Sequence, residues 1–234
     1  LSSRKPLEEI MTACQDTDVV ELAKQFIDID SITGNEYNMA MALYSWLKPR
    51  GFTVKFQCVD VGEKNDDELI DPQNAPQKQR YNVLAYPTNT DPKKAKIIIN
   101  SHIDTVPPYL GAAVQRKNKL YGRGAVDTKS IIAAQLIAAQ TLLRQHALRS
   151  MALLYTVGEE VDSIGMRRAN RLQLNAAKFM ITGEPTESRT ISGQKGCYKF
   201  DLESVGTAAH SAYPEKGQCA LTPLVNIVHA IQNE

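Results

Sequence analysis

Apolar residues recur every three or four positions in several stretches of the chain, which is the period of a helix that buries one face. Residues 17–29 show this period first, with Val19, Leu22 and Phe26 on one side. We predict helices at residues 17–29, 35–48, 128–146, 163–173 and 219–232. The helix at 128–146 has a broad face rich in alanine, so we expect it to pack closely on a sheet.

Strands are predicted where apolar residues alternate with polar ones or form short runs. Residues 52–59 alternate, which is typical of a half-buried strand. The three isoleucines at 97–99 favour a strand buried on both faces, as in parallel sheets. Further strands are predicted at 81–86, 96–101, 151–157 and 178–182, with a small hairpin at 113–122 and a long polar surface loop at 60–80. Because strands and helices alternate, the pattern predicts an α/β domain with a largely parallel sheet flanked by helices.

The pattern changes near residue 193. Residues 196–205 alternate like an antiparallel strand, and a turn-rich segment leads from there into the helix at 219–232. One strand and one helix are too little to enclose a core. We therefore expect residues 1–192 to form one domain and residues 193–234 to be the beginning of a second, smaller α+β domain that is truncated in this chain.

Charge and hydropathy exclude two classes of protein. The 27 Lys and Arg residues nearly balance the 26 Asp and Glu residues, for a net charge of +1. This balance argues against a dedicated nucleic-acid binder, which usually has a basic excess. No apolar run reaches the roughly 18 residues that a membrane-spanning helix needs. We expect neither nucleic acid nor a membrane as a partner.

The cysteines bear on metal chemistry and on compartment. Cys14, Cys58, Cys197 and Cys219 lie far apart and form no C-x-x-C pair, which excludes a cysteine-rich zinc ribbon. They are also too sparse for a disulfide scaffold, so we expect free thiols in a cytoplasmic protein. The first residues lack the apolar core of a signal peptide, although a signal that has been removed leaves a secreted or vacuolar location open.

Acidic residues and one histidine follow the predicted apolar strands. Each has an ordinary explanation when taken alone, as a surface pair, a helix cap or a loop residue. In open α/β sheets, however, ligands bind at the carboxyl ends of the strands, and these residues would meet there. They are His102 and Asp104 after strand 96–101, Glu159 and Glu160 after strand 151–157, Glu184 after strand 178–182, and Asp127 before helix 128–146.

Several carboxylates at one edge would repel each other, and burial would raise their pKa values. A multivalent cation removes both problems. Mixed ligation by histidine and carboxylates suits Zn²⁺, with Co²⁺ or Mn²⁺ as substitutes. The residues alone therefore predict a metal site.

Four motifs resemble those of the co-catalytic zinc hydrolases, the group of acetylornithine deacetylase, succinyl-diaminopimelate desuccinylase, aminoacylase and carboxypeptidase G. They occur in the same order as in that family, and the resemblance covers residues 17–217. The motifs are S-H-I-D-T-V-P at 101–107, G-R-G-A-V-D-T-K at 122–129, G-E-E at 158–160 and G-E-P-T at 183–186.

The resemblance implies a role for each matching residue. Asp127 would bridge two metal ions. His102 and Glu184 would complete the ligands of one ion, and Glu160 would bind the other. Asp104 would hold the second ring nitrogen of His102, which fixes its tautomer. Glu159 would be the general base that takes a proton from the attacking water and passes it to the leaving amine.

The segment 205–214 is similar to a motif of the family's lid domain. It implies that His210 stabilises the oxyanion of the tetrahedral intermediate, supplied across a homodimer formed through the lid. In the family the chain later returns to the catalytic domain and adds a last histidine ligand. Because this chain ends at Glu234, we expect an incomplete catalytic domain that binds one ion more tightly than the other and has little activity alone. His146 and His229 are expected at the surface.

The substrate implied is an N-acyl amino acid, because residues 183–186 look like the deacetylase branch. A dipeptidase or carboxypeptidase of the same family is the alternative, and so is a truncated fragment that only binds metal or dimerises. A nucleotide-binding domain is disfavoured, because Asp127 stands where the third glycine of G-x-G-x-x-G belongs. A serine hydrolase is excluded by the absence of G-x-S-x-G.

Overall fold

The computed structural model describes residues 19–59, 69–146, 149–196 and 200–233. The chain forms two compact units, Leu1–Ser188 and Arg189–Glu234. The roles expected for them, catalytic and lid domain, stay predictions.

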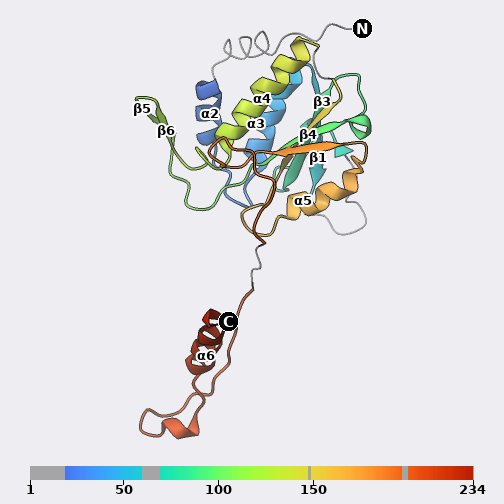
Figure 1. Ribbon diagram of the computed structural model, residues 1–234. Coiled ribbons are helices and arrows are strands. Elements are labelled where there is room, and N and C mark those ends of the chain that lie inside the picture. The colour runs from blue at the N-terminus through green and yellow to red at the C-terminus, as the bar shows by residue number, and fades with distance from the viewer. Residues whose placement is uncertain (1–18, 60–68, 147–148, 197–199, 234) are drawn as a thin grey trace. The chain divides into compact units, whose positions relative to one another are not determined.

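A six-stranded sheet lies at the centre of the described part of the first unit, in the order β2-β1-β3-β7-β4-β8 (Figure 1). Strands β4, β7 and β8 run parallel to each other, whereas β1, β2 and β3 add an antiparallel half. The predicted α/β class is confirmed, and the parallel half carries the predicted site. The strands are β1 Phe52–Cys58, β2 Leu69–Ile70, β3 Tyr81–Pro87, β4 Ile97–His102, β7 Met151–Thr156 and β8 Phe179–Thr182.

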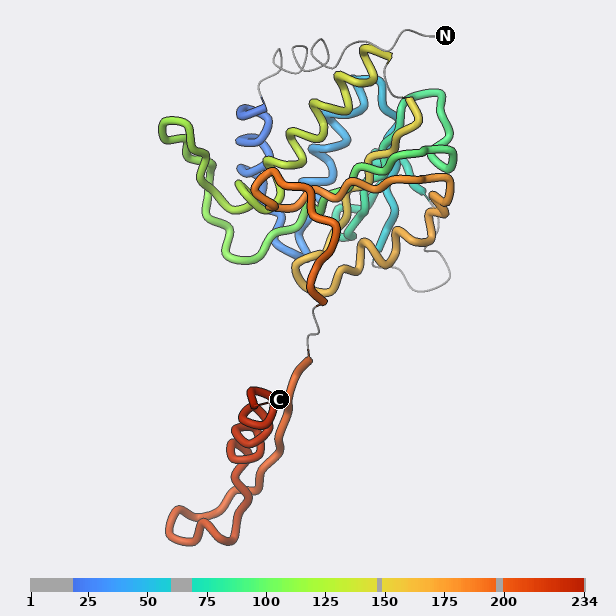
Figure 2. The backbone as a smooth tube through the Cα atoms, in the orientation of Figure 1, coloured from blue at the N-terminus to red at the C-terminus, as the bar shows by residue number. Residues whose placement is uncertain are grey.

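Helices cover both faces of this sheet. On one face α2, α3 and α4 pack into the larger hydrophobic core, and Figures 1 and 2 show these helices side by side. On the other face α5 and the turn after it pack on Leu84, Ile98 and Leu154. Every residue of β7 is buried, as expected for a strand between two helical layers. The helices are α2 Val19–Ile27, α3 Tyr37–Leu47, α4 Lys129–Arg144 and α5 Ile164–Ala169.

Most predicted boundaries lie within a few residues of the observed ones. The predicted hairpin is confirmed as β5 Val114–Arg116 and β6 Lys119–Tyr121. The helix predicted at 163–173 is shorter, because α5 ends at Ala169 and a 3-10 turn follows it. The alanines of α4 are buried at positions 133 and 139, so its close packing on the sheet is confirmed.

The loop predicted at 60–80 is wrong in its second part. Residues 60–68 lie outside the described residues, but Leu69 and Ile70 form strand β2, which pairs with Phe56 and Gln57 at the sheet edge. Asp71 then caps a short 3-10 turn by accepting a hydrogen bond from the Gln73 N–H. A strand of two residues shows no alternation, so its pairing comes from the neighbouring strand and not from its own sequence.

In the second unit, helix α6 (Leu221–Gln232) is confirmed, but the strand predicted at 196–205 is not formed in its described residues. Residues 197–199 lie outside the described part. The alternation of residues 200–205 finds no neighbouring strand there, and a strand needs a partner for its backbone hydrogen bonds. Among the described residues of this unit, Thr207 and Gln218 form an isolated bridge instead. His229 is exposed on α6, and His146 is exposed after α4, as predicted.

No helix in the described ranges combines the length and the apolar character that crossing a bilayer requires.

Candidate metal centre

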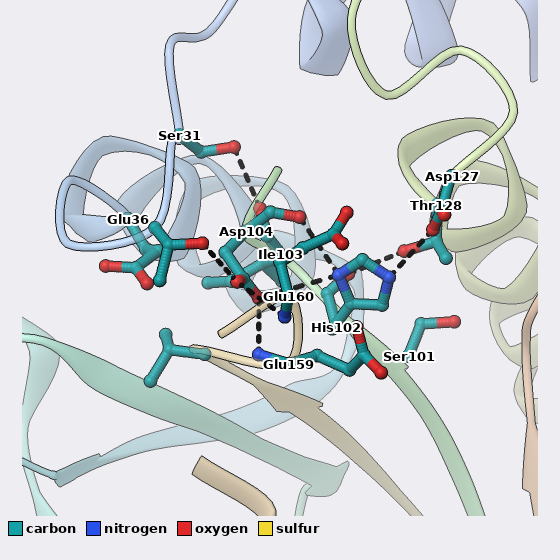
Figure 3. A network of polar contacts seen from close by, with 12 residues as sticks. Ser31, Glu36, Ser101, His102, Ile103, Asp104, Asp127, Thr128, Glu159 and Glu160 are labelled. Carbon is teal, nitrogen blue, oxygen red and sulfur yellow. Dashed lines mark hydrogen bonds and ion pairs between the residues drawn. The ribbon is translucent and has the colours of Figure 1, made fainter. Parts of the chain in front are cut away.

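The site is built around His102, the last residue of β4. Its imidazole is buried between Asp127 on one side and Asp104 on the other (Figure 3). The Nε2 atom lies 2.8 Å from Asp127 Oδ1 and 3.9 Å from Glu184 Oε2. Because β4 pairs in parallel with both β7 and β8, the residues that follow these strands meet at this edge of the sheet.

The other ring nitrogen faces Asp104, through both the backbone oxygen and the carboxylate of that residue. His102 Nδ1 lies 2.9 Å from the backbone oxygen of Asp104 and 3.5 Å from its Oδ1 atom. With Nδ1 carrying the hydrogen donated to that carbonyl oxygen, Nε2 is left with a lone pair for a metal ion. The main-chain oxygen of Asp104 therefore orients the ring at the shorter distance. The Asp104 carboxylate contacts the same ring nitrogen at 3.5 Å and makes further contacts as well.

That carboxylate clamps the turn that carries the paired glutamates. Asp104 Oδ1 accepts a hydrogen bond from the Glu159 N–H at 3.0 Å, and Oδ2 accepts one from the Glu160 N–H at 3.2 Å. The Thr33 hydroxyl donates a third to Oδ2 at 2.7 Å. Gly158 starts this turn at a φ of +73°, and a Cβ there would lie 2.8 Å from Arg80 Nη2. Only glycine fits this conformation and this close contact.

Asp127 is placed by contacts on both sides of it. The next residue, Thr128, donates its hydroxyl hydrogen to the His102 carbonyl oxygen at 2.6 Å. Lys129, at the start of α4, is 1% exposed and donates to the carbonyl oxygen of Ile29. Gly124 lies directly over the Lys129 side chain, since a Cβ there would come within 2.7 Å of its Cδ atom. The loop before α4 is thus fixed to β4 and to the end of α2.

Glu184 follows β8, and Gly183, the residue directly before it, is tightly packed. The Gly183 N–H donates to Asn100 O at 2.8 Å, and the Ser101 hydroxyl donates to Gly183 O at 2.8 Å. A Cβ on Gly183 would lie 2.3–2.5 Å from atoms of Gln135, Ile131 and Ser101. Close packing of this glycine brings Glu184 up to His102.

Two groups of three side chains offer ligand atoms that lie within 4.8 Å of one another. One group is His102, Asp127 and Glu184, and the other is His102, Glu159 and Glu160. They share the imidazole, so the two groups adjoin at His102. Nitrogen and carboxylate oxygens in this number suit Zn²⁺ and its neighbours, so the donor set fits the predicted metal.

The electrostatics of the cluster point the same way. Partial burial and the charges of Asp127, Glu159 and Glu160 raise the pKa of Glu184 to about 7, although His102 opposes this. Burial and the Asp127 charge also raise the pKa of Glu160. Burial would lower the pKa of His102, but the carboxylates of Asp104 and Asp127 raise it to about 11. The raised pKa values of the two glutamates mean that protonation relieves the repulsion between neighbouring carboxylates. A bound cation would relieve the same repulsion in place of the protons.

One carboxylate behaves differently. Burial alone would raise the pKa of Asp104, but the hydrogen bonds from His102, Thr33 and the Glu159 N–H outweigh it and lower that pKa. Asp104 therefore stays charged and acts as a fixed anion beneath the site.

The structure brings six of the seven predicted site residues together in the first unit. The seventh, His210, belongs to the second unit, where its Nδ1 accepts the Ala212 N–H at 3.1 Å. Sequence reasoning missed Thr33 and Thr128. Nothing in their local sequence marks them, because each acts through a residue far away in the chain.

An α/β sheet with such a cluster at the carboxyl ends of its parallel strands defines a class of metal-dependent hydrolases. Residues 98–220 match the peptidase family M20/M25/M40, and the chain belongs to this family. The predicted resemblance is thereby confirmed.

Similar curated proteins carry the name probable carboxypeptidase. The one from Aspergillus flavus is 34% identical over 231 residues, which are 93% of this chain and 50% of that protein. The one from Talaromyces marneffei is 35% identical over 227 residues, 88% of this chain and 48% of that protein. The chain spans about half the length of the curated relatives it matches.

Solved structures share the fold at low sequence identity. A tripeptidase from Staphylococcus aureus aligns with a TM-score of 0.59 and 20% identity, over 90% of this chain and 55% of that one. Human carnosine dipeptidase 1 aligns with a TM-score of 0.55 and 17% identity, over 75% of this chain and 39% of that one.

Proposed function

We propose that this chain carries the metal-binding part of an active site that hydrolyses the amide bond before a C-terminal amino acid, as a metal-dependent carboxypeptidase. The observation that carries the proposal is the sharing of one buried imidazole, His102, by two groups of carboxylates. The names of the relatives support the substrate class, since those proteins are called probable carboxypeptidases.

In this proposal His102, Asp127 and Glu184 would hold one Zn²⁺ ion, and Asp127 and Glu160 would hold a second. Co²⁺ or Mn²⁺ would fit the same donors. Bound ions of this kind lower the pKa of a coordinated water and polarise a carbonyl group. Asp104 keeps the His102 ring oriented and the Glu159–Glu160 turn in place.

Glu159 is the proposed general base. It is the more exposed of the two adjacent glutamates, and its backbone N–H is tied to Asp104, so its side chain is free to reach a water molecule. It would take a proton from that water and then give it to the amine that leaves. Both carboxylates lie within 4.8 Å of the His102 ring, but Glu160 is half-buried, which suits a ligand better than a proton carrier.

His210 is the proposed oxyanion donor. Because its Nδ1 accepts the Ala212 N–H, the neutral ring carries its hydrogen on Nε2. This is the form that can donate a hydrogen bond to a developing negative charge. That His210 comes from a homodimer partner through the lid remains part of the proposal, which sedimentation of the chain would test.

A cavity of about 270 Å³ adjoins the metal ligands. It is lined by Val106, residues 122–127 and Glu160. Its lining mixes apolar residues with Arg123, Asp127 and Glu160, and its position beside Asp127 suits a part of the substrate next to the bond that is cleaved.

The test is hydrolysis of N-blocked dipeptides by the chain after loading with Zn²⁺. A Glu159→Gln variant should keep its zinc, measured by calorimetry, and lose hydrolysis. Substrates with an amidated C-terminus should be cleaved much more slowly than those with a free carboxylate. Zinc binding without any hydrolysis, by this chain and by a version extended to the length of its relatives, would refute the proposal.

Deacylation of N-acyl amino acids is the second candidate, favoured by the G-E-P-T segment at 183–186. The two substrates share an amide nitrogen that belongs to an amino acid with a free carboxylate. N-acetylated amino acids in the same assay separate the candidates, since faster turnover of these than of N-blocked dipeptides would make the chain a deacylase.

A further inference from the structure

The segment between α2 and α3 runs alongside the residues that follow β4. The Thr33 N–H donates to Thr105 O at 3.1 Å, and the Thr105 N–H donates to Ser31 O at 3.0 Å. The Ser31 hydroxyl donates to Ile103 O at 2.8 Å. Ser31 and Thr105 are each 1% exposed, so water does not compete for these bonds. The segment is thus fixed firmly to the strand end that carries His102 and Asp104.

This attachment brings the Thr33 hydroxyl within hydrogen-bond distance of the buried Asp104 carboxylate. Its Oγ1 atom donates to Asp104 Oδ2 at 2.7 Å, and the Asp104 carboxylate also accepts the N–H groups of Glu159 and Glu160. A buried carboxylate needs every such donor, because a lost hydrogen bond is not replaced by water. Without the hydrogen bond from Thr33, the Asp104 side chain can rotate, and the N–H groups of Glu159 and Glu160 lose an acceptor held in a fixed position.

We propose that Thr33 is a positioning residue, which acts through Asp104 to hold Glu159 and Glu160 in place for metal binding and proton transfer. The proposal rests on the proposed function for the roles of the two glutamates. Thr33 and Asp104 are 71 positions apart in the chain, and Asp104 and Glu159 are 55 positions apart. Hydrogen bonds of the described structure join both pairs.

Hydrogen exchange of individual amides, followed by NMR on the metal-free chain, tests the link without any need for activity. Thr33→Val removes the hydroxyl and keeps the shape, and we expect the amides of Glu159 and Glu160 to exchange about tenfold faster. The amide of Leu154, in the middle of β7, should not change. Thr33→Ser keeps a hydroxyl and should exchange as the unaltered chain does.

Thr90→Val is the matched control. Thr90 is half-buried like Thr33 and donates its hydroxyl hydrogen to Pro87 O at 2.6 Å. It lies in the loop before β4, whereas His102 is the last residue of that strand. This variant should leave the Glu159 and Glu160 amides unchanged. Thr33→Ala serves as a second variant in case the valine methyl prevents folding. Unchanged exchange at Glu159 and Glu160 in a folded Thr33→Val or Thr33→Ala chain would overturn the proposal, and so would an equal acceleration at Leu154.

Function is read out separately. Zinc titration should show a loss of affinity of about tenfold in Thr33→Val, within the range for partners that orient metal ligands. Where hydrolysis is measurable, kcat should fall about tenfold and KM should stay constant. Faster exchange together with unaltered zinc affinity would refute the positioning role. Absence of zinc binding and hydrolysis in every chain, with the exchange difference present, would refute the proposed function instead.

Discussion

His102 Nε2 and Asp127 Oδ1 lie 2.8 Å apart, although the first ends a buried strand and the second precedes a helix. The histidine side chain is 1% exposed, whereas that of the aspartate is 47% exposed. The pair therefore joins the interior to the surface at the edge of the sheet. A cation that bound both side chains would have one ligand from the interior and one from the surface.

Asp127→Asn should weaken zinc binding and leave the fold unchanged. The amide keeps the size of the side chain but removes its negative charge, so we expect zinc affinity to fall by about 100-fold or more, beyond the 10- to 100-fold typical of partners outside the ligand shell. The pKa of His102 in the metal-free chain should fall, because Asp127 contributes to raising it. Calorimetry and NMR titration of the His102 ring measure the two effects.

Asp162→Asn is the control for this change. Asp162 lies near the same edge, where its carboxylate accepts the Ile164 N–H at 3.0 Å and lies 3.6 Å from the exposed Arg167. The asparagine oxygen can still accept the Ile164 N–H. This variant should bind zinc as the unaltered chain does. Equal zinc affinity in Asp127→Asn and Asp162→Asn would show that Asp127 is not a ligand.

Zinc should bind more tightly as the pH rises from 5 to 8. The pKa of Glu184 is raised to about 7 and that of His102 to about 11, so both groups must release a proton before they can ligate. Titration in buffers with different ionisation enthalpies should show proton release on binding.

The same pKa shifts determine the stability of the metal-free chain. The folded pKa of Glu184 lies above its ordinary value of 4.5, so its stabilising contribution is complete below pH 4.5 and is lost as the pH rises through about 7. For His102 the corresponding loss extends from pH 6.5 to about 11. The rise in Tm on adding zinc should therefore grow between pH 5 and 8, and a constant rise would contradict this account.

Gly183→Ala should weaken the site and the fold together. The added methyl group would come within 2.5 Å of Ile131 and Ser101, so β8 must shift and carry Glu184 away from His102. Overpacking of this kind costs about 1–3 kcal/mol of unfolding free energy. Gly193→Ala is the control, since no atom lies within 4 Å of the added group. Denaturant unfolding and zinc titration of both variants test this, and equal results for the two would contradict it.

The central part of the site could be predicted from sequence, because apolar runs identify the strands and parallel strands end at a common edge. His102, Glu160 and Glu184 each follow such a run, and the structure places them together. The contact of Thr33 with Asp104 could not be predicted, since it depends on how the segment before α3 lies against β4. Helix and strand periods carry no information about such side chain contacts between distant segments.

The antiparallel half of the sheet also could not be predicted from the pattern of hydrophobic residues. Strand β7 lies between β3 and β4, antiparallel to the first and parallel to the second, and hydrophobic runs do not specify which neighbour a strand takes. The alternation at 200–205 led to a wrong strand for the same reason. Pairing is a property of two segments, and the sequence of one segment cannot establish it.

Asn82 offers a last test, of the support beneath the glutamate turn. It is fully buried, donates to Gln57 Oε1 at 2.9 Å and to Gly165 O at 2.7 Å, and accepts the Val157 N–H at 3.2 Å. Asn82→Leu removes the Asn82 partner of Gln57 Oε1 and of the Val157 N–H, and one hydrogen bond to Gly165 O, so we expect a loss of about 3 kcal/mol in unfolding free energy. Because Val157 directly precedes Gly158, the amides of the following turn should also exchange faster in the folded state.

The exposed Asn118, in the β5–β6 hairpin, provides the matched control. Asn118→Leu should change the unfolding free energy by less than about 0.5 kcal/mol, as is usual for surface substitutions. Denaturant unfolding measures the first effect, and NMR exchange below the unfolding transition measures the second. A destabilised Asn82→Leu chain with unchanged exchange at Glu159 would mean that Asn82 supports the sheet and α5 but not the turn. In that case the position of the two glutamates would depend on Asp104 and Gly158 alone.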